Sequence, residues 1–200
     1  MDYKDGIEEY FTRLSSTLSE LNIDAINRAM NAIMDAYNRS ATIYIFGNGG
    51  SAATASHFCC DFNKGVCENL PRKFRFVCLN DNIPTILAIA NDVSYDDIFL
   101  MQLEGKLSDD DLIIAISGSG NSKNVIKAVE YAKKVGAKVV GLSGYDGGKL
   151  KTLADYPMHV NSNDMQIVED VHLAFNHMMM KVLRGVICGA VKLDDAFPKN

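Results

Sequence analysis

Short, wholly apolar runs alternate along the chain with longer stretches in which apolar residues recur every three or four positions. An apolar run bounded by turn residues is typical of a buried strand, and the three-to-four spacing is typical of an amphipathic helix. The predicted strands are residues 42–46, 74–79, 112–116, 138–142 and 158–160. Helices are predicted over residues 52–63, 85–90, 95–105, 124–135 and 149–154, with a last helix from a cap at Asp164 to about residue 186. Strands that are apolar throughout are covered on both faces, so the pattern predicts an α/β fold with a parallel sheet between two layers of helices.

Two further helical patterns precede the first strand. Both show apolar residues four and three positions apart, at Ile7, Phe11, Leu14, Leu18 and Leu21 and then at Ile26, Met30, Ile33 and Tyr37. A seam this regular packs either on its own domain or on helices of another subunit, and we favour the second. We therefore divide the chain into N-terminal helices for oligomerisation (residues 1–40), an α/β domain (41–188) and a loosely ordered tail (189–200).

A Gly-rich turn follows each of two predicted strands. The first turn covers residues 47–51 and the second covers residues 117–122, and each leads directly into a helix. Helix starts present unpaired amides and the positive end of the helix dipole, and serine hydroxyls add short hydrogen bonds, so both turns suit a phosphate. Ligands of parallel sheets bind at the carboxyl ends of the strands, where both turns would lie. The sequence therefore predicts one phosphate site formed by both turns.

Neither turn fully matches a nucleotide-binding motif. A Walker loop needs Gly-Lys followed by Ser or Thr, and the chain has only Gly148-Lys149-Leu150. Residues 47–52 satisfy the dinucleotide pattern, but the acidic partner expected about 20 residues further on comes late, at Asp81. The motifs argue against a Walker-type site and against a nicotinamide dehydrogenase.

Ionisable residues gather on two of the predicted helices. His57 and Asp61 are one turn apart and share a helix face. The last helix carries Glu169, His172 and His177 over one broad face. Imidazoles and carboxylates can hold a divalent metal such as zinc, or they can act as an acid and a base that move a proton between adjacent carbons. The spacing leaves both roles open.

Taken together, these motifs resemble the sugar isomerase (SIS) domain, and within it the sedoheptulose 7-phosphate isomerase branch. The resemblance is carried by residues 47–53 with His57, by residues 117–124, and by residues 169–172 with His177; residues 91–92 with Tyr95 and Phe99 also resemble a family segment near the substrate. It implies a flavodoxin-like three-layer fold with a five-stranded parallel sheet and an N-terminal helical extension. It also implies a homotetramer held by a helical bundle, with active sites at subunit interfaces.

The resemblance also assigns roles to individual residues. Catalysis would fall to Asp61 and His177, and a zinc site to His57, Asp61, Glu169 and His177. The implied substrate-binding residues are Asn48, Gly49, Ser51, Asp92, Ser117, Gly118, Ser119, Ser122 and Glu169. The four serines among them would hold the phosphate.

Three residues depart from the family pattern. Asp61 stands in place of the catalytic glutamate, Glu169 in place of a metal-binding glutamine, and Gly65, with Lys64 alongside, in place of an arginine. Asp is one methylene shorter than Glu, and a base displaced by about 1 Å can lose orders of magnitude in rate. The changes therefore indicate either a retuned isomerase or a protein that has lost catalysis.

Our leading hypothesis is an aldose–ketose isomerase for a phosphorylated sugar, with sedoheptulose 7-phosphate as the expected substrate. The alternative is a non-catalytic binding protein, similar to the SIS branch that binds the bacterial replication initiator. The formal net charge of −5 argues against direct nucleic-acid binding. No apolar run reaches the roughly 20 residues needed to cross a bilayer, and the start of the chain lacks a signal peptide's apolar core. We therefore expect a cytoplasmic protein.

Overall fold

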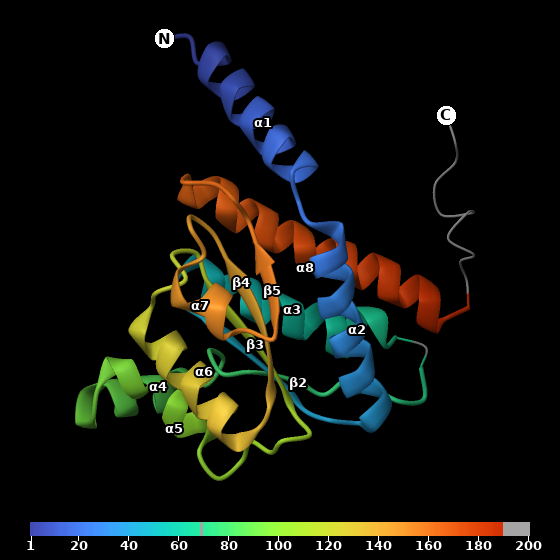
Figure 1. Cartoon of the computed structure of the whole chain (residues 1–200), viewed down its shortest axis with the longest axis vertical. Coiled ribbons are helices and arrows are strands. Elements are labelled where there is room, and N and C mark those ends of the chain that lie inside the picture. The colour runs from blue at the N-terminus through green and yellow to red at the C-terminus, as the bar shows by residue number, and fades with distance from the viewer. Residues whose placement is uncertain (69, 190–200) are drawn as a thin grey trace.

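A five-stranded parallel sheet forms the centre of the molecule (Figure 1). The computed structural model of the chain describes residues 1–68 and 70–189. The strands stand in the order β2-β1-β3-β4-β5, which is the flavodoxin-like order. Their bounds are β1 Ile43–Gly47, β2 Phe76–Cys78, β3 Leu112–Ser117, β4 Lys138–Ser143 and β5 Tyr156–His159. Each lies at a predicted apolar run, although β5 begins before the expected residue 158. Residues 190–200 of the expected loose tail lie outside the described part of the chain.

Alternate residues of the central strands point to opposite faces of the sheet. On β1, Ile43 and Ile45 pack into one core, and Tyr44 and Phe46 pack into the other. The first core is covered by α2 (Ile23–Arg39), α3 (Gly50–Cys60) and α8 (Met165–Ile187). The second is covered by α4 (Ile83–Asp92), α5 (Leu100–Leu103), α6 (Lys123–Val135) and α7 (Gly148–Leu153). The predicted helix over residues 95–105 is instead a 3₁₀ turn, η2 (Tyr95–Asp97), followed by α5. The three-layer architecture is therefore the one that the apolar strands require.

The two N-terminal helices differ in what covers their apolar seams. On α2, the whole seam predicted from the sequence is buried against the helix's own domain. On α1 (Lys4–Ser19) no residue is buried, and Phe11 is 62% exposed. Figure 1 shows α1 projecting beyond the sheet, and the helix contacts α8. An oligomerisation role for residues 1–40 stays a prediction, and the apolar face that is still open for it belongs to α1.

The helix that follows the first Gly-rich turn changes its pitch before it ends. The sequence predicts one helix over residues 52–63, whereas α3 ends at Cys60 and a π-helix, η1 (Asp61–Val66), follows. Wide turns of this kind are rare and frequently occur at functional sites. The change begins at Asp61, one of the candidate catalytic residues. In the described residues, no helix is long and apolar enough to cross a membrane.

Candidate active site

The two Gly-rich turns open at the same edge of the sheet because β1 and β3 are neighbours. Gly47, the last residue of β1, pairs with Ile116 on β3. Helix α3 begins within the first turn and α6 begins directly after the second. The first amides of both helices therefore lie at this edge, an arrangement that favours an anion. In the second turn, the hydroxyl oxygens of Ser117 and Ser122 lie 3.0 Å apart and close the loop.

Two positions in the first turn require glycine, for different reasons. A Cβ at Gly47 would be 2.6 Å from Ser51 Cβ and 2.9 Å from the Ile116 carbonyl oxygen, so a side chain does not fit there. Gly49, the N-cap of α3, has a φ of +56°, a left-handed value that favours glycine. The start of α3 therefore depends on residues without a side chain.

A network of amides joins the two turns. Asn48 Nδ2 donates to Asn124 Oδ1 (2.9 Å), and Asn124 Nδ2 donates to Asn48 Oδ1 (3.0 Å). The backbone N–H of Val125 also donates to Asn124 Oδ1 (2.9 Å), which fixes the amide orientation because a backbone N–H can only donate. Tyr95 adds a hydrogen bond from its hydroxyl to Asn48 Oδ1 (2.9 Å). Among the described residues, one N–H of Asn48 is left without a partner and can donate to a ligand held between the turns.

The neighbouring candidate Asp92 lies at the exposed end of α4. Its Oδ1 accepts a hydrogen bond from Asn91 Nδ2 (2.7 Å). Within the described part of the chain, residues 91–95 are hydrogen-bonded to the turns through Tyr95, whose hydroxyl donates to Asn48 Oδ1. The expected position of Asp92 next to the sugar stays a prediction.

Three of the predicted ionisable residues form one cluster. The candidate ligand atoms of His57, Asp61 and His177 all lie within 4.8 Å of one another. His57 Nε2 is 3.5 Å from Asp61 Oδ2, and the two imidazole rings meet edge to face with centroids 4.9 Å apart. The side chain of His57 is 42% exposed and that of Asp61 is 14% exposed, so the cluster can be reached from solvent. Two imidazole nitrogens and one carboxylate, with an open fourth position, fit a catalytic zinc ion chemically.

Glu169 lies beside this cluster without being part of it. It lines a cavity of about 240 Å³ together with His57 and with residues of α3 and α8. Its carboxylate lies against Gly50 in the first turn of α3, where any Cβ would collide with it. Of the four predicted zinc ligands, the structure thus gathers three, and Glu169 lies on the wall of the adjoining cavity.

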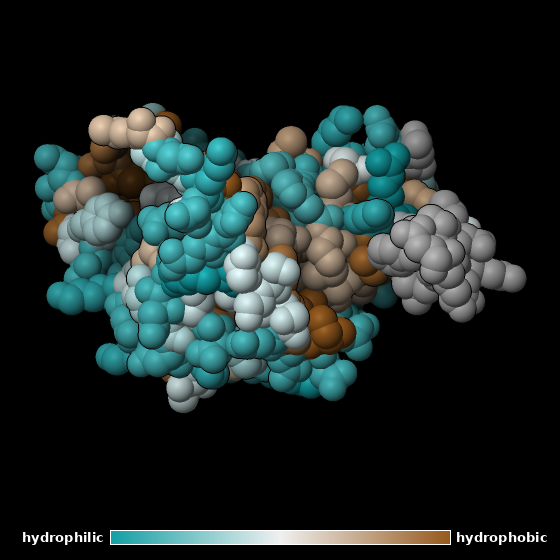
Figure 2. Space-filling model, turned by 90° about the horizontal axis from the view of Figure 1, so that it is seen from above, coloured by the Kyte–Doolittle hydropathy of each residue, from teal (hydrophilic) through white to brown (hydrophobic). Residues whose placement is uncertain are grey.

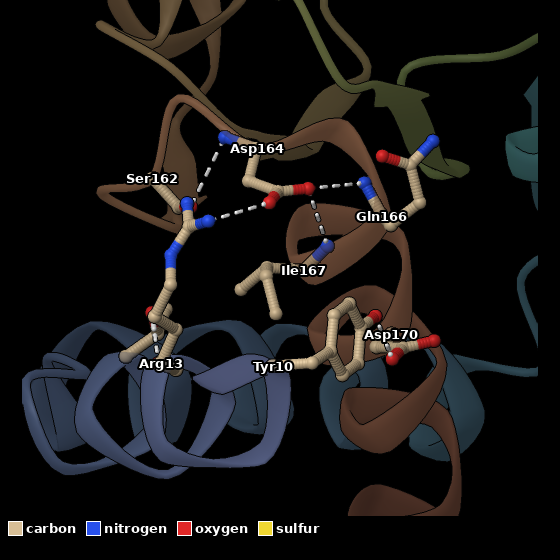
Figure 3. A network of polar contacts seen from close by, with 8 residues as sticks. Tyr10, Arg13, Ser162, Asp164, Gln166, Ile167 and Asp170 are labelled. Atoms are coloured by element: carbon tan, nitrogen blue, oxygen red, sulfur yellow. Dashed lines mark hydrogen bonds and ion pairs between the residues drawn. The ribbon is translucent and has the colours of Figure 1, made fainter. Parts of the chain in front are cut away.

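Helix α1 contacts the start of α8 next to the same cavity (Figure 3). The Tyr10 hydroxyl donates to Asp170 Oδ2 (2.6 Å), and Arg13 pairs with Asp164 (3.2 Å). The hydrogen bond to Asp170, which also lines the cavity, raises the pKa of Tyr10 to about 12. Asp164 caps α8 as predicted, because its Oδ1 accepts from the backbone amides of the first turn. Polar contacts therefore fix α1 at the wall of the cavity.

His172 does not join the cluster, although it shares a broad helix face with Glu169 and His177. It is buried in the core, where neither ring nitrogen has a hydrogen-bond partner among the described residues. Burial lowers the pKa of His172 to about 4, so its ring is neutral at physiological pH. His172 is therefore a core residue.

A buried glycine occupies the position of the expected family arginine. Gly65 lies in η1, and a Cβ there would collide with the terminal methyl group of Met180. The adjacent Lys64 pairs with Glu68 (3.4 Å). Neither residue places a cation beside His57 and Asp61 in the described structure.

Two buried asparagines were missed as site residues by the sequence reasoning. Asn124 ends the second loop, and its side chain forms the bridge to Asn48. Asn176 donates from Nδ2 to Asp61 Oδ2 (2.8 Å) across 115 positions of sequence. Its position next to His177 was the only available signal, because helix spacing carries no information on contacts with another helix.

Comparison with known proteins identifies the family of the chain. The family model of the SIS domain matches residues 7–144. A protein of Thermoplasma acidophilum named probable phosphoheptose isomerase is 36% identical over 92% of this chain and 98% of its own length. A phosphoheptose isomerase of Helicobacter pylori is 37% identical over 78% of this chain and 81% of its own length. The solved structure of a phosphoheptose isomerase from Neisseria gonorrhoeae has a TM-score of 0.84 at 26% identity, covering 91% of this chain and 98% of that one.

The flavodoxin-like sheet, the paired Gly/Ser turns and the matched family model define a SIS domain. These relatives narrow the class further, because their similarity to this chain extends over nearly its whole length. The chain belongs to the phosphoheptose isomerase family.

Proposed function

We propose that the protein is a phosphosugar isomerase that interconverts sedoheptulose 7-phosphate and an aldoheptose 7-phosphate. The observation that carries this proposal is the meeting of His57, Asp61 and His177 at the C-terminal end of α3, the helix that follows the first phosphate-type turn. The cavity that His57 lines extends to Gly50 at the start of the same helix. The names of the relatives, phosphoheptose isomerase, support the same substrate class.

In this proposal the phosphate is bound between the two turns. The hydroxyls and helix amides there carry no negative charge, so they can donate to the phosphate oxygens. The free N–H of Asn48 then donates to a sugar oxygen, because both lone-pair positions of its Oδ1 are already taken by Asn124 and Tyr95. The proposed phosphate and sugar ligands are Asn48, Gly49, Ser51, Asp92, Ser117, Gly118, Ser119, Ser122 and Glu169.

The reaction needs one proton moved between adjacent carbons and one moved between their oxygens. Asp61, as a carboxylate, takes the proton from C1 of the open-chain ketose, and the resulting enediol receives it back at C2. His177 gives a proton to the C2 oxygen and accepts one from the C1 oxygen, so that no net proton is gained or lost. His57, Asp61 and His177, with Glu169 nearby, would hold zinc, which would supply a Lewis acid for the sugar oxygens. Asp61 and His177 would each bind it through one atom, so that the second carboxylate oxygen and the second ring nitrogen remain for proton transfer.

The proposal is tested by separating binding from turnover. Asp61→Asn and His177→Gln are expected to lower kcat at least about a hundredfold while sedoheptulose 7-phosphate still binds, because the general base or acid is removed and the turns are untouched. His159→Gln, which changes a histidine on β5, is the matched control and should keep full activity. Full activity in either site variant would contradict its role. Saturable binding by wild-type protein without conversion would favour the non-catalytic alternative.

We also propose that the protein is a homotetramer that works in the cytoplasm. Association between subunits is supported by two exposed apolar surfaces, one on α1 around Ile7 and Phe11 and one on α4 around Ile83 and Leu87. Figure 2 shows hydrophobic groups at the left edge, on the side where Figure 1 places α4, and further hydrophobic groups near the centre of the same face. Phe11→Glu is expected to lower the mass measured by light scattering, with Glu9→Gln as the control. An unchanged mass would contradict a role for α1, and a monomeric wild type would contradict the tetramer.

A further inference from the structure

The contacts of the candidate base Asp61 fall on only one of its two oxygens. Oδ2 accepts a hydrogen bond from Asn176 Nδ2 (2.8 Å) and lies 3.5 Å from His57 Nε2. Oδ1 has no hydrogen-bond partner among the described residues. One oxygen is therefore held by the protein, and the other is available to a substrate.

We propose that Asn176 is a positioning residue that holds the Asp61 carboxylate so that Oδ1 can receive the substrate proton. This inference rests on the proposed isomerase function. A hydrogen bond to an ionised carboxylate is short and directional, and proton transfer depends steeply on the position of the base. Asn176 is fully buried on α8, so packing on every side restricts its side chain.

The other end of the Asn176 amide supports a functional role. A carboxylate oxygen can only accept, so Nδ2 must face Asp61 and Oδ1 must face the interior. There Asn176 Oδ1 is buried without a hydrogen-bond partner in the described structure. An unpaired buried oxygen destabilises the folded state, and a side chain of the same shape without polar atoms would avoid that cost. Stability alone therefore does not account for an amide at this position.

The placement of Asn176 couples it to both candidate catalytic groups. It precedes His177 on α8, and Asp61 opens the π-helix η1 on the neighbouring segment. Asp61 is one methylene shorter than the glutamate that the family resemblance implies at this position, and Asn176 lies in hydrogen-bond contact with the end of this shorter side chain. A glutamate at position 61 would extend into the space that the Asn176 amide occupies. Positions 61 and 176 should therefore depend on each other.

Asn176→Leu is the sharpest test because leucine keeps the branched shape and removes the donor. For zinc-supplemented protein acting on sedoheptulose 7-phosphate, kcat is expected to fall at least about tenfold, with KM changed less than about twofold and an unchanged or higher melting temperature. Asn63→Ala is the control. Asn63 lies in η1, as Asp61 does, but its side chain hydrogen-bonds to the backbone of Phe76 on β2. It should lower the melting temperature without changing kcat. A lower melting temperature with normal kcat for Asn176→Leu would overturn the inference.

A double-mutant cycle tests the dependence between the two positions. Asp61→Glu combined with Asn176→Ala should be more active than Asp61→Glu alone, because the smaller residue makes room for the longer carboxylate. Asn176→Ala in the Asp61 protein should instead reduce kcat. Equal effects of Asn176→Ala in both backgrounds would contradict the proposal.

A spectroscopic readout separates this inference from the proposed function. The Asn176 side-chain amide protons, identified by their absence in Asn176→Leu, should resonate downfield and move upfield in Asp61→Ala. No shift would contradict the positioning contact, whatever the activity. A further outcome is that the Asn176 amide protons are shifted downfield as expected in a wild-type protein that converts no phosphosugar. That result would contradict the proposed function, and with it a catalytic role for the contact.

Discussion

The amide bridge between Asn48 and Asn124 allows a quantitative prediction for the integrity of the phosphate site. The perturbation is Asn124→Leu, which keeps the approximate volume of a side chain that is only 2% exposed and removes its polar atoms. Three hydrogen bonds are lost: two with Asn48 and one from the Val125 backbone N–H. The site should lose both stability and the fixed orientation of Asn48.

The magnitude follows from the surroundings of each partner. Asn48 is partly exposed and can bond to water instead, so each of its two bonds contributes about 0.5–1 kcal/mol. The Val125 amide is buried and would be left unpaired, at a cost of about 1–3 kcal/mol. The expected loss is about 2–5 kcal/mol, which for a chain of this size lowers the melting temperature by roughly 4–20 °C.

Calorimetry on wild-type and variant protein measures this loss, and substrate titration measures its effect on the site. KM for sedoheptulose 7-phosphate should rise in Asn124→Leu because the donor of Asn48 is no longer held towards the ligand. Tyr95→Phe is the graded control: it removes one bond from an exposed side chain and should cost less than about 1 kcal/mol. A melting temperature for Asn124→Leu within about 2 °C of wild type would refute the reasoning.

Three further predictions concern single residues. Gly47→Ala should destabilise the fold by about 1–3 kcal/mol in calorimetry, because a Cβ there meets the turn and the β3 backbone; wild-type stability would contradict the geometry. The pKa of His172 is lowered by folding, so the unfolded chain binds a proton first, and stability should fall by about 3 kcal/mol as the pH drops from about 6.5 to 4. Replacing His172 by Phe should flatten this stability profile, and an unchanged slope would show that other groups cause it. The Tyr10 hydroxyl should ionise near pH 12 in an absorbance titration and at a lower pH in Asp170→Asn; the same curve in both proteins would show that the contact is absent in solution.

The strands and their layers could be predicted because every central strand is apolar on both faces. Ile43 and Ile45 serve one core and Tyr44 and Phe46 the other, so the run itself carries the information that two layers cover the sheet. The flavodoxin-like strand order came from the family resemblance, and the structure agrees with it. The seam on α2 could not be assigned, because the same periodicity suits the domain's own core and a partner helix.

The site was predictable only as far as local spacing reaches. His57 and Asp61 share a face because they are four residues apart where α3 continues into η1, and Glu169 and His177 lie on α8, where a helix was predicted. The same spacing did not reveal that His172 turns into the core, since a broad helix face includes both buried and open positions. The pitch change at Asp61 and the contact with Asn176 depend on packing between distant segments, for which the sequence contains no periodic signal.

The most direct test of the account is conversion of sedoheptulose 7-phosphate by the wild-type protein in D₂O, followed by NMR with and without added zinc. The account predicts that signals of an aldoheptose 7-phosphate appear and that deuterium enters at C1 or C2, because the proton carried by Asp61 exchanges with solvent during the enediol step. Conversion should be lost in Asp61→Asn. The absence of both product and deuterium exchange, in protein that still binds the sugar phosphate, would contradict the assignment of His57, Asp61 and His177 as a catalytic cluster.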